Sequence, residues 1–156
     1  MKQYWLFKTE PDAFSINDLA NRPNKREGWD GVRNYQARNF MRDAMKVGDM
    51  AFIYHSSCKN IGIAGLAKVS QIGLTDQTQF DPESHYFDPK SMPEKPRWQM
   101  VELEHVETFN NILPLATIKQ MPNIVELGLV KKGSRLSIMP VEEQEFEILL
   151  NEARNN

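Results

Sequence analysis

Residues 29–42 constrain the fold of this chain more than any other stretch. They place a tryptophan, a glycine and an arginine directly before apolar residues at helical spacing, which predicts a helix over residues 35–46. Asn34 is a good N-cap for that helix, since its side-chain oxygen can accept a hydrogen bond from an amide of the first turn. Trp29 and Arg33 then lie beside the positive end of the helix dipole, which suits an anion or a base acceptor. Taken singly, each of these residues also fits a capped surface helix with a packed tryptophan.

Short strand and helix patterns alternate along the rest of the chain at irregular spacing. Aromatic and β-branched runs predict strands over residues 3–8, 49–56, 61–72, 98–107 and 135–139. Helical patterns begin at Ser15, at Pro114 and after Pro140. Residues 76–96 are rich in proline and predict a long loop of the kind that is often functional. Because this spacing is not a regular βαβ repeat, we expect one α+β domain over residues 1–156, with a small curled or closed sheet and short helices on its sides.

Composition and charge exclude several classes of protein. The 156 residues are 40% hydrophobic and 26% charged, and no apolar run approaches the roughly 20 residues of a membrane span. The first apolar run is too short for a signal peptide, and the single cysteine, Cys58, fits a reducing compartment. We therefore expect a cytoplasmic protein, or a nuclear one in a eukaryote, without a membrane partner. A net charge of −2 argues against a generally basic nucleic-acid coat.

The residues that usually carry metal or nucleophilic chemistry lack the required spacing. No histidine has a partner at a recognisable ligand spacing, so we expect neither a metal nor a cofactor. Residues 62–65 (Gly-Ile-Ala-Gly) lie inside a predicted strand and not between a strand and a helix, which excludes a dinucleotide fingerprint. A nucleophile within residues 55–58 (His-Ser-Ser-Cys) is conceivable, but no acid is placed to orient the histidine. An inert thiol is the better interpretation of Cys58.

Recognition of a nucleic-acid base fits the residue pattern better. A base stacked on an aromatic side chain contributes roughly 1–3 kcal/mol of binding free energy. The candidate stacking residues are Trp5, Trp29, Tyr54 and Trp98, although core packing is the alternative for each. The candidates for reading a base edge are Asn34, His55 and Ser56, and those for holding phosphates are Lys8, Arg33, Arg38 and Arg42. Trp29 stands out because it lies beside a glycine, in a polar turn at a helix N-terminus.

Five blocks of the sequence resemble one known family in order and over essentially the whole chain. The blocks are residues 5–11 (Trp-Leu-Phe-Lys-Thr-Glu-Pro), 29–38 (Trp-Asp-Gly-Val-Arg-Asn-Tyr-Gln-Ala-Arg), 48–56, 62–65 and 135–141 (Arg-Leu-Ser-Ile-Met-Pro-Val). They resemble the EVE domain, which implies a PUA-like fold, a small β-barrel of five to six mostly antiparallel strands with flanking helices, related to YTH and ASCH domains. The resemblance also implies a pocket for a modified base, and EVE domains are associated with modified cytosines. The aromatic cage of YTH domains has no matching positions here.

The resemblance maps a candidate site onto this chain. The expected base pocket consists of Trp5, Lys8, Trp29, Val32, Asn34, Tyr54, His55, Ser56 and Ser137. The expected backbone-phosphate contacts are Arg33, Arg38 and Arg42. The expected partner is a nucleic acid or nucleotide that carries a modified base, with the choice between DNA and RNA and the oligomeric state left open.

Three functions are consistent with this site. The first is a non-enzymatic reader that binds a modified cytosine in an aromatic-lined pocket. The second, by resemblance to some ASCH relatives, is a hydrolase of a modified nucleoside or base, with Lys8, Glu10, His55 or Ser56 as acid, base or nucleophile. The third is a protein-interaction module in which the aromatic residues form the core and residues 76–96 bind a partner.

Overall fold

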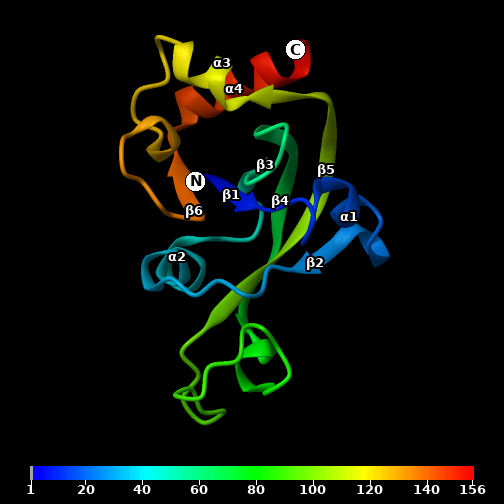
Figure 1. Cartoon of the computed structure of the whole chain (residues 1–156), viewed down its shortest axis with the longest axis vertical. Coiled ribbons are helices and arrows are strands. Elements are labelled where there is room, and N and C mark those ends of the chain that lie inside the picture. Colours follow the sequence, from blue (N-terminus) through cyan, green and yellow to red (C-terminus); the bar gives the residue numbers. More distant parts are fainter. Residues whose placement is uncertain (1) are drawn as a thin grey trace.

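The computed structural model describes residues 2–156 and contains one sheet with short helices on both of its faces (Figure 1). The strands are β1 (Tyr4–Thr9), β2 (Arg26–Gly28), β3 (Met50–His55), β4 (Gly62–Thr75), β5 (Gln99–Pro114) and β6 (Ile138–Val141). The α-helices are α1 (Ile16–Ala20), α2 (Tyr35–Asn39), α3 (Leu115–Gln120) and α4 (Glu143–Asn155). A π-helical turn, Phe40–Ala44, follows α2, and 3₁₀ turns lie at Pro23–Lys25, Gln77–Phe80 and Gly128–Val130. None of the helices in residues 2–156 has the length and apolar character needed to cross a bilayer.

The six strands form a single sheet in the order β2-β5-β4-β3-β1-β6. All neighbouring strands are antiparallel except β1 and β3, which are parallel and place Lys8 opposite Tyr54. The predicted α+β class and the predicted number of mostly antiparallel strands are therefore confirmed. The expected barrel closure is corrected, because the sheet is open between β2 and β6. These edge strands have three and four residues, and each pairs along one side only.

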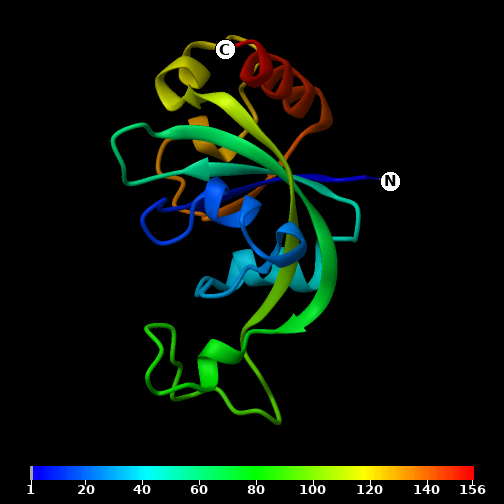
Figure 2. The same ribbon diagram turned by 90° about the vertical axis from the view of Figure 1, so that its right-hand side faces the viewer.

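Both faces of the sheet are covered, and each face has its own apolar cluster. One cluster joins the sheet to α1 and α2 through residues such as Ile16, Leu19 and Ala37. The other joins it to α3 and α4 and includes Phe146 and Leu149. Figures 1 and 2 show α3 and α4 at one end of the molecule, with α1 and α2 below them. Because a strand points successive side chains to opposite faces and both faces are covered, β3 buries five of its six residues and β4 buries its first six in a row.

The helix caps follow the sequence closely, whereas the predicted length of the second helix is wrong. Ser15 and the third helical residue, Asp18, form the predicted capping box of α1. Asn34 caps α2, and its Oδ1 accepts a hydrogen bond of 2.9 Å from the amide of Ala37. However, α2 is only five residues long and continues as a π turn, in which the amide of Met45 donates to the carbonyl of Phe40. The extra residue in this turn lets Met45 join the core.

Residues 76–98, which we call the lobe, connect β4 to β5 and project away from the sheet (Figure 2). A buried polar centre organises the lobe. The Gln79 side-chain amide donates to the carbonyls of Asp76 and Trp98, at 2.6 and 2.8 Å. Its oxygen accepts hydrogen bonds of 3.1 Å each from the amides of Arg97 and Trp98. The predicted long loop is thus an ordered unit with one 3₁₀ turn.

Candidate functional site

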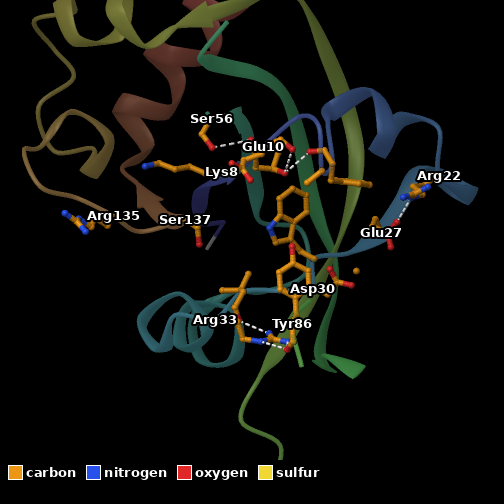
Figure 3. A pocket seen from close by; sticks show the side chains of 17 residues that line it. Lys8, Glu10, Arg22, Glu27, Asp30, Arg33, Ser56, Tyr86, Arg135 and Ser137 are labelled. Carbon is orange, nitrogen blue, oxygen red and sulfur yellow. Dashed lines mark hydrogen bonds and ion pairs between the residues drawn. The ribbon is translucent and has the colours of Figure 1, made fainter. Parts of the chain in front are cut away.

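A cavity of about 550 Å³ lies where the end of β1, the turn after β2, the segment before β6 and the lobe meet (Figure 3). This volume falls in the range of small-molecule sites. In Figure 3, Lys8, Glu10 and Ser56 lie along the upper wall, and Asp30, Arg33 and Tyr86 along the lower one. Arg135 and Ser137 lie on one side, and Arg22 and Glu27 on the other. The remaining lining residues are Thr9, Ala13, Phe14, Gly28, Trp29, Gly31 and Val32.

Trp29 is held firmly but keeps one polar group free. It is only 8% exposed, and its ring packs edge-on against Phe7 and Phe14, with centroid distances of 5.4 and 5.7 Å. Its amide donates a 2.8 Å hydrogen bond to the carbonyl of Val101. The indole N–H has no acceptor among residues 2–156 and is not among the fully buried atoms that lack one. The indole therefore offers a fixed donor to the cavity.

Arg33 anchors the lobe to the turn that carries Trp29. The buried carboxylate of Asp76 accepts from the amide of Gly31 at 2.8 Å and from Arg33 at 3.0 Å. The other N–H groups of Arg33 donate to the carbonyls of Val32 and Tyr86 and to the hydroxyl of Thr78. All five N–H groups of the guanidinium are thereby used within the protein. Arg33, which we expected to contact a phosphate, thus has no free donor for one.

Neither of the other two arginines expected to hold phosphates lines the cavity. Arg38 stacks on Tyr35 with its guanidinium carbon 4.6 Å from the ring centroid, and it donates to the carbonyl of Arg97 at 2.8 Å. Its pKa lies below the ordinary value because of burial and because of the neighbouring Arg42 charge. Arg42 pairs with Asp43 at 2.8 Å. The arginines on α2 and its π turn therefore support the lobe and the helix surface.

Two other cations, Lys8 and Arg135, lie along the cavity without an acidic partner in the described part of the chain. Burial lowers the pKa of the Lys8 ammonium, which lies 5.9 Å from the centroid of the Tyr54 ring. Arg135 is exposed and points outward from the segment before β6 (Figure 3). The positive side of the cavity is thus formed by β1 and this segment, and not by α2.

The acids along the cavity differ in their partners. Glu27 pairs with Arg22, while the carboxylates of Glu10 and Asp30 accept no hydrogen bond from another residue within 2–156. Burial raises the pKa of Asp30, the neighbouring carboxylates of Asp76 and Glu27 raise it further, and Arg33 opposes them. Asp30 is exposed to solvent, so its carboxylate keeps its access to water and remains free to bind a group in the cavity. Among residues 2–156, no group of three or more His, Cys, Asp or Glu side chains is arranged to hold a metal ion.

The structure brings together five of the nine residues predicted for the base pocket. These are Lys8, Trp29, Val32, Ser56 and Ser137. Sequence reasoning missed part of the lower wall, namely Asp30 and Tyr86, together with Phe14 and Arg135. Asp30 directly follows Trp29, and Tyr86 is an aromatic residue in a long loop, so both carried a signal that was available in the sequence.

The four other predicted pocket residues lie outside the cavity lining, each for a local reason. The Trp5 indole donates to the buried carboxylate of Asp49 at 3.1 Å. Tyr54 is buried on the face of the sheet that packs against α3 and α4, and burial raises its pKa to about 12. His55 accepts a 3.1 Å hydrogen bond through Nε2 from the first amide of α1, and burial lowers its pKa. Asn34 uses its side-chain oxygen to cap α2.

Comparison with known proteins gives consistent matches along the whole chain. The sequence model of the EVE domain matches residues 3–152. Human thymocyte nuclear protein 1 is 40% identical over 167 residues, which cover 97% of this chain and 74% of the human protein. A crystal structure from Pseudomonas putida is 50% identical, with a TM-score of 0.91 over 96% of this chain and 99% of that one.

A further solved structure contains a ligand. It is a crystal structure of human THYN1 protein in complex with 5-methylcytosine-containing DNA. That protein is 38% identical to this chain, with a TM-score of 0.90 and 99% of each chain covered.

Proposed function

This chain belongs to the EVE domain family, and from that membership we propose that it is a non-enzymatic reader that binds a modified cytosine of DNA. The modified base would enter the cavity beside Trp29. One observation carries the proposal: the Trp29 indole is fixed by Phe7 and Phe14, while its N–H remains open to a cavity of about 550 Å³. The human relative solved with 5-methylcytosine-containing DNA supports the choice of ligand.

The shape of the site favours a base that has left the stack. A cavity enclosed by β1, the lobe and the turn after β2 admits one base but not a duplex, so the nucleotide must rotate out of the helix. The indole N–H would then donate to an acceptor on the base, and the aromatic surface would contribute to binding. Phe14 and Val32 provide apolar surface near the same place.

The charges of the cavity favour phosphates at its Lys8 and Arg135 side. Neither cation has an acidic partner in the described residues, so both can bind a backbone phosphate without breaking an ion pair. We therefore expect Lys8 and Arg135, and not Arg33, Arg38 and Arg42, to contact the phosphates.

The alternatives have less support from the geometry. A hydrolase that used His55 and Ser56 would need the histidine in the cavity, but its Nε2 is bound to the amide of Ile16. The Ser56 hydroxyl donates only to the carbonyl of Thr9, at 3.5 Å, and not to a side chain that could act as a general base. A pure interaction module predicts a fully buried Trp29 without a neighbouring cavity, whereas Trp29 lines one.

The test is a titration of fluorescein-labelled duplexes followed by anisotropy. The duplexes differ only in one central cytosine, which is either methylated at C5 or unmodified, and an RNA of the same sequence forms a third arm. Burial of one methyl group contributes about 0.8 kcal/mol, so the methylated DNA should bind about fourfold more tightly or better. Equal affinity for the two duplexes would refute the proposal. Tighter binding of the RNA would show that the ligand is RNA and not DNA. Mass spectrometry after incubation with modified nucleosides should show no product.

A further inference from the structure

Thymine presents any reader of 5-methylcytosine with a chemical problem. Both bases are pyrimidines that carry the same methyl group at C5, so apolar contacts to this methyl group do not separate them. They differ at position 4, where 5-methylcytosine has an amine that donates hydrogen bonds and thymine has a carbonyl that accepts them. Since DNA contains far more thymine than 5-methylcytosine, the cavity needs a group that distinguishes an amine from a carbonyl.

Resting on the proposed function, we propose that Asp30 is the specificity-determining residue that accepts a hydrogen bond from the amine at position 4 and rejects thymine. Asp30 follows Trp29 directly and lines the same cavity. The next residue in the turn is fixed, because the amide of Gly31 donates to the buried carboxylate of Asp76 at 2.8 Å. The backbone that carries Asp30 is thus held on both sides.

The carboxylate of Asp30 is exposed and forms no ion pair within residues 2–156, so it is free to accept a hydrogen bond from a base in the cavity. Its carboxylate lies near two further acids, Asp76 and Glu27, which raise its pKa after burial itself. In a protein that binds a polyanion, an additional unpaired acid also weakens attraction to the phosphates. An ionised carboxylate accepts hydrogen bonds and cannot donate them, so its natural partner is a donor such as a base amine. A hydrogen bond from that amine offsets the repulsion from the neighbouring acids and from the phosphates.

The layout of the cavity places position 4 of the base near Asp30. In a pyrimidine nucleotide the sugar is attached at N1, which lies across the ring from C4. The unpaired cations Lys8 and Arg135 lie on one side of the cavity, and Asp30 lies away from them on the lower wall (Figure 3). A nucleotide with its phosphate at Lys8 and Arg135 therefore extends its position 4 towards the wall that contains Asp30.

The carboxylate separates the two bases by attraction and by repulsion. It accepts from the amine of 5-methylcytosine, but it lies against the carbonyl oxygen of thymine, where both groups are acceptors. Wrong pairing of this kind leaves a charged group without its hydrogen bond. A discrimination of about 10- to 100-fold between the two bases follows from such a contact.

The cavity contains its own control for this inference. Glu10 is the other unpaired carboxylate of the lining, but it lies beside Lys8 on the upper wall (Figure 3). Neutralising Glu10 changes the net charge as much as neutralising Asp30 does. Only Asp30 is expected to affect the choice of base.

The experiment measures the affinity of wild type, Asp30→Asn and Glu10→Gln for DNA with a central 5-methylcytosine, cytosine or thymine. The central base is placed opposite an abasic site, so that no base pair has to be broken. Wild type should prefer 5-methylcytosine to thymine about 10- to 100-fold. Asp30→Asn should bring this ratio to within about threefold of unity, because the side-chain amide presents either its oxygen or its nitrogen to position 4. Glu10→Gln should keep the wild-type ratio.

The possible results separate the two proposals. If wild type prefers 5-methylcytosine to cytosine and Asp30→Asn keeps the wild-type ratio of 5-methylcytosine to thymine, the role of Asp30 is refuted and the reader function stands. If wild type does not distinguish 5-methylcytosine from cytosine, both fail. A thermal unfolding scan supplies the check of the fold. Since the Asp30 carboxylate makes no hydrogen bond with another residue within 2–156 and lies near other acids, Asp30→Asn should keep or raise the Tm.

Discussion

A Cβ atom at Gly31 would lie 2.7 Å from the ring of Tyr86, so the aromatic ring occupies the space that a side chain would need. Gly31 also has a φ of +78°, a conformation that L residues rarely adopt. Residue 31 therefore has two independent reasons to be glycine. This contact brings the lobe against the turn that carries Trp29 and completes the lower wall of the cavity.

Replacement of Gly31 tests this contact. Gly31→Ala should lower the free energy of unfolding by about 1 kcal/mol for its φ and by about 1–3 kcal/mol more for the clash with Tyr86. Gly73→Ala is the matched control, since Gly73 has a φ of +74° but no atom within 4 Å of an added Cβ. Urea unfolding measures both variants. Equal losses of unfolding free energy in the two variants would show that the Tyr86 ring moves aside without a cost in stability.

The second prediction concerns Arg33 and the lobe. Arg33→Lys keeps the charge but loses most of the hydrogen bonds to Tyr86, Thr78 and Asp76. We expect a loss of about 2–3 kcal/mol and faster hydrogen exchange in residues 76–98. Arg42→Lys, whose ion pair with Asp43 is exposed, should change stability by less than about 0.5 kcal/mol. Unchanged exchange in the lobe of Arg33→Lys would contradict the anchoring role.

The third prediction separates the two sets of cations in DNA binding. Each phosphate contact contributes about 0.9 to the slope of log K against log salt concentration. Arg135→Gln should reduce the magnitude of this slope by about that amount, whereas Arg42→Gln should leave it unchanged. Anisotropy titrations at several salt concentrations give the slopes. If only Arg42→Gln reduced the slope, the phosphates would contact the arginines of α2 and its π turn and not Arg135.

The fourth prediction concerns acid pH. The indole of Trp98 donates to Asp88 at 2.7 Å, and the amide of Lys90 donates to the same carboxylate at 2.9 Å. These two hydrogen bonds, the indole first, hold the pKa of Asp88 below its ordinary value of 3.8. Because the pKa is lower in the folded protein, this stabilisation is complete above about pH 4 and is lost as the pH falls through the folded-state pKa.

The indole N–H signal of Trp98 in NMR spectra reports on this contact directly. In wild type the signal should shift as the pH falls below about 4, when the carboxylate becomes protonated. Asp88→Asn should remove that pH dependence. A signal that titrates identically in both proteins would assign the acid sensitivity to another group.

The sequence identified those features of the fold that depend on local chemistry. The caps at Ser15 and Asn34 were predicted because a side chain and an amide three residues away determine them. The alternation in β3 correctly predicted that Phe52 and Tyr54 share one face. The π turn after α2 was not predicted, because the burial of Met45 against the sheet decides it.

Five of the residues predicted for the pocket line the cavity, and they come from four separate segments of the chain: Lys8, residues 29–32, Ser56 and Ser137. Trp29 and Val32 reach the cavity from the same turn. Trp5 was assigned to the pocket because nothing local reveals that its N–H is accepted by Asp49, 44 residues away. Arg33 was assigned to a phosphate for the same reason, since its partners Asp76, Thr78 and Tyr86 lie in the lobe.

The most direct test of the central claim is the affinity of Trp29→Phe for DNA that contains 5-methylcytosine. Phenylalanine keeps an aromatic ring between Phe7 and Phe14 but lacks the N–H that faces the cavity. Trp98→Phe is the control, because Trp98 donates to Asp88 and does not line the cavity. With circular dichroism unchanged, Trp29→Phe should bind about tenfold more weakly, and Trp98→Phe should stay within about twofold of wild type. Wild-type affinity in Trp29→Phe would contradict a base-binding cavity beside Trp29.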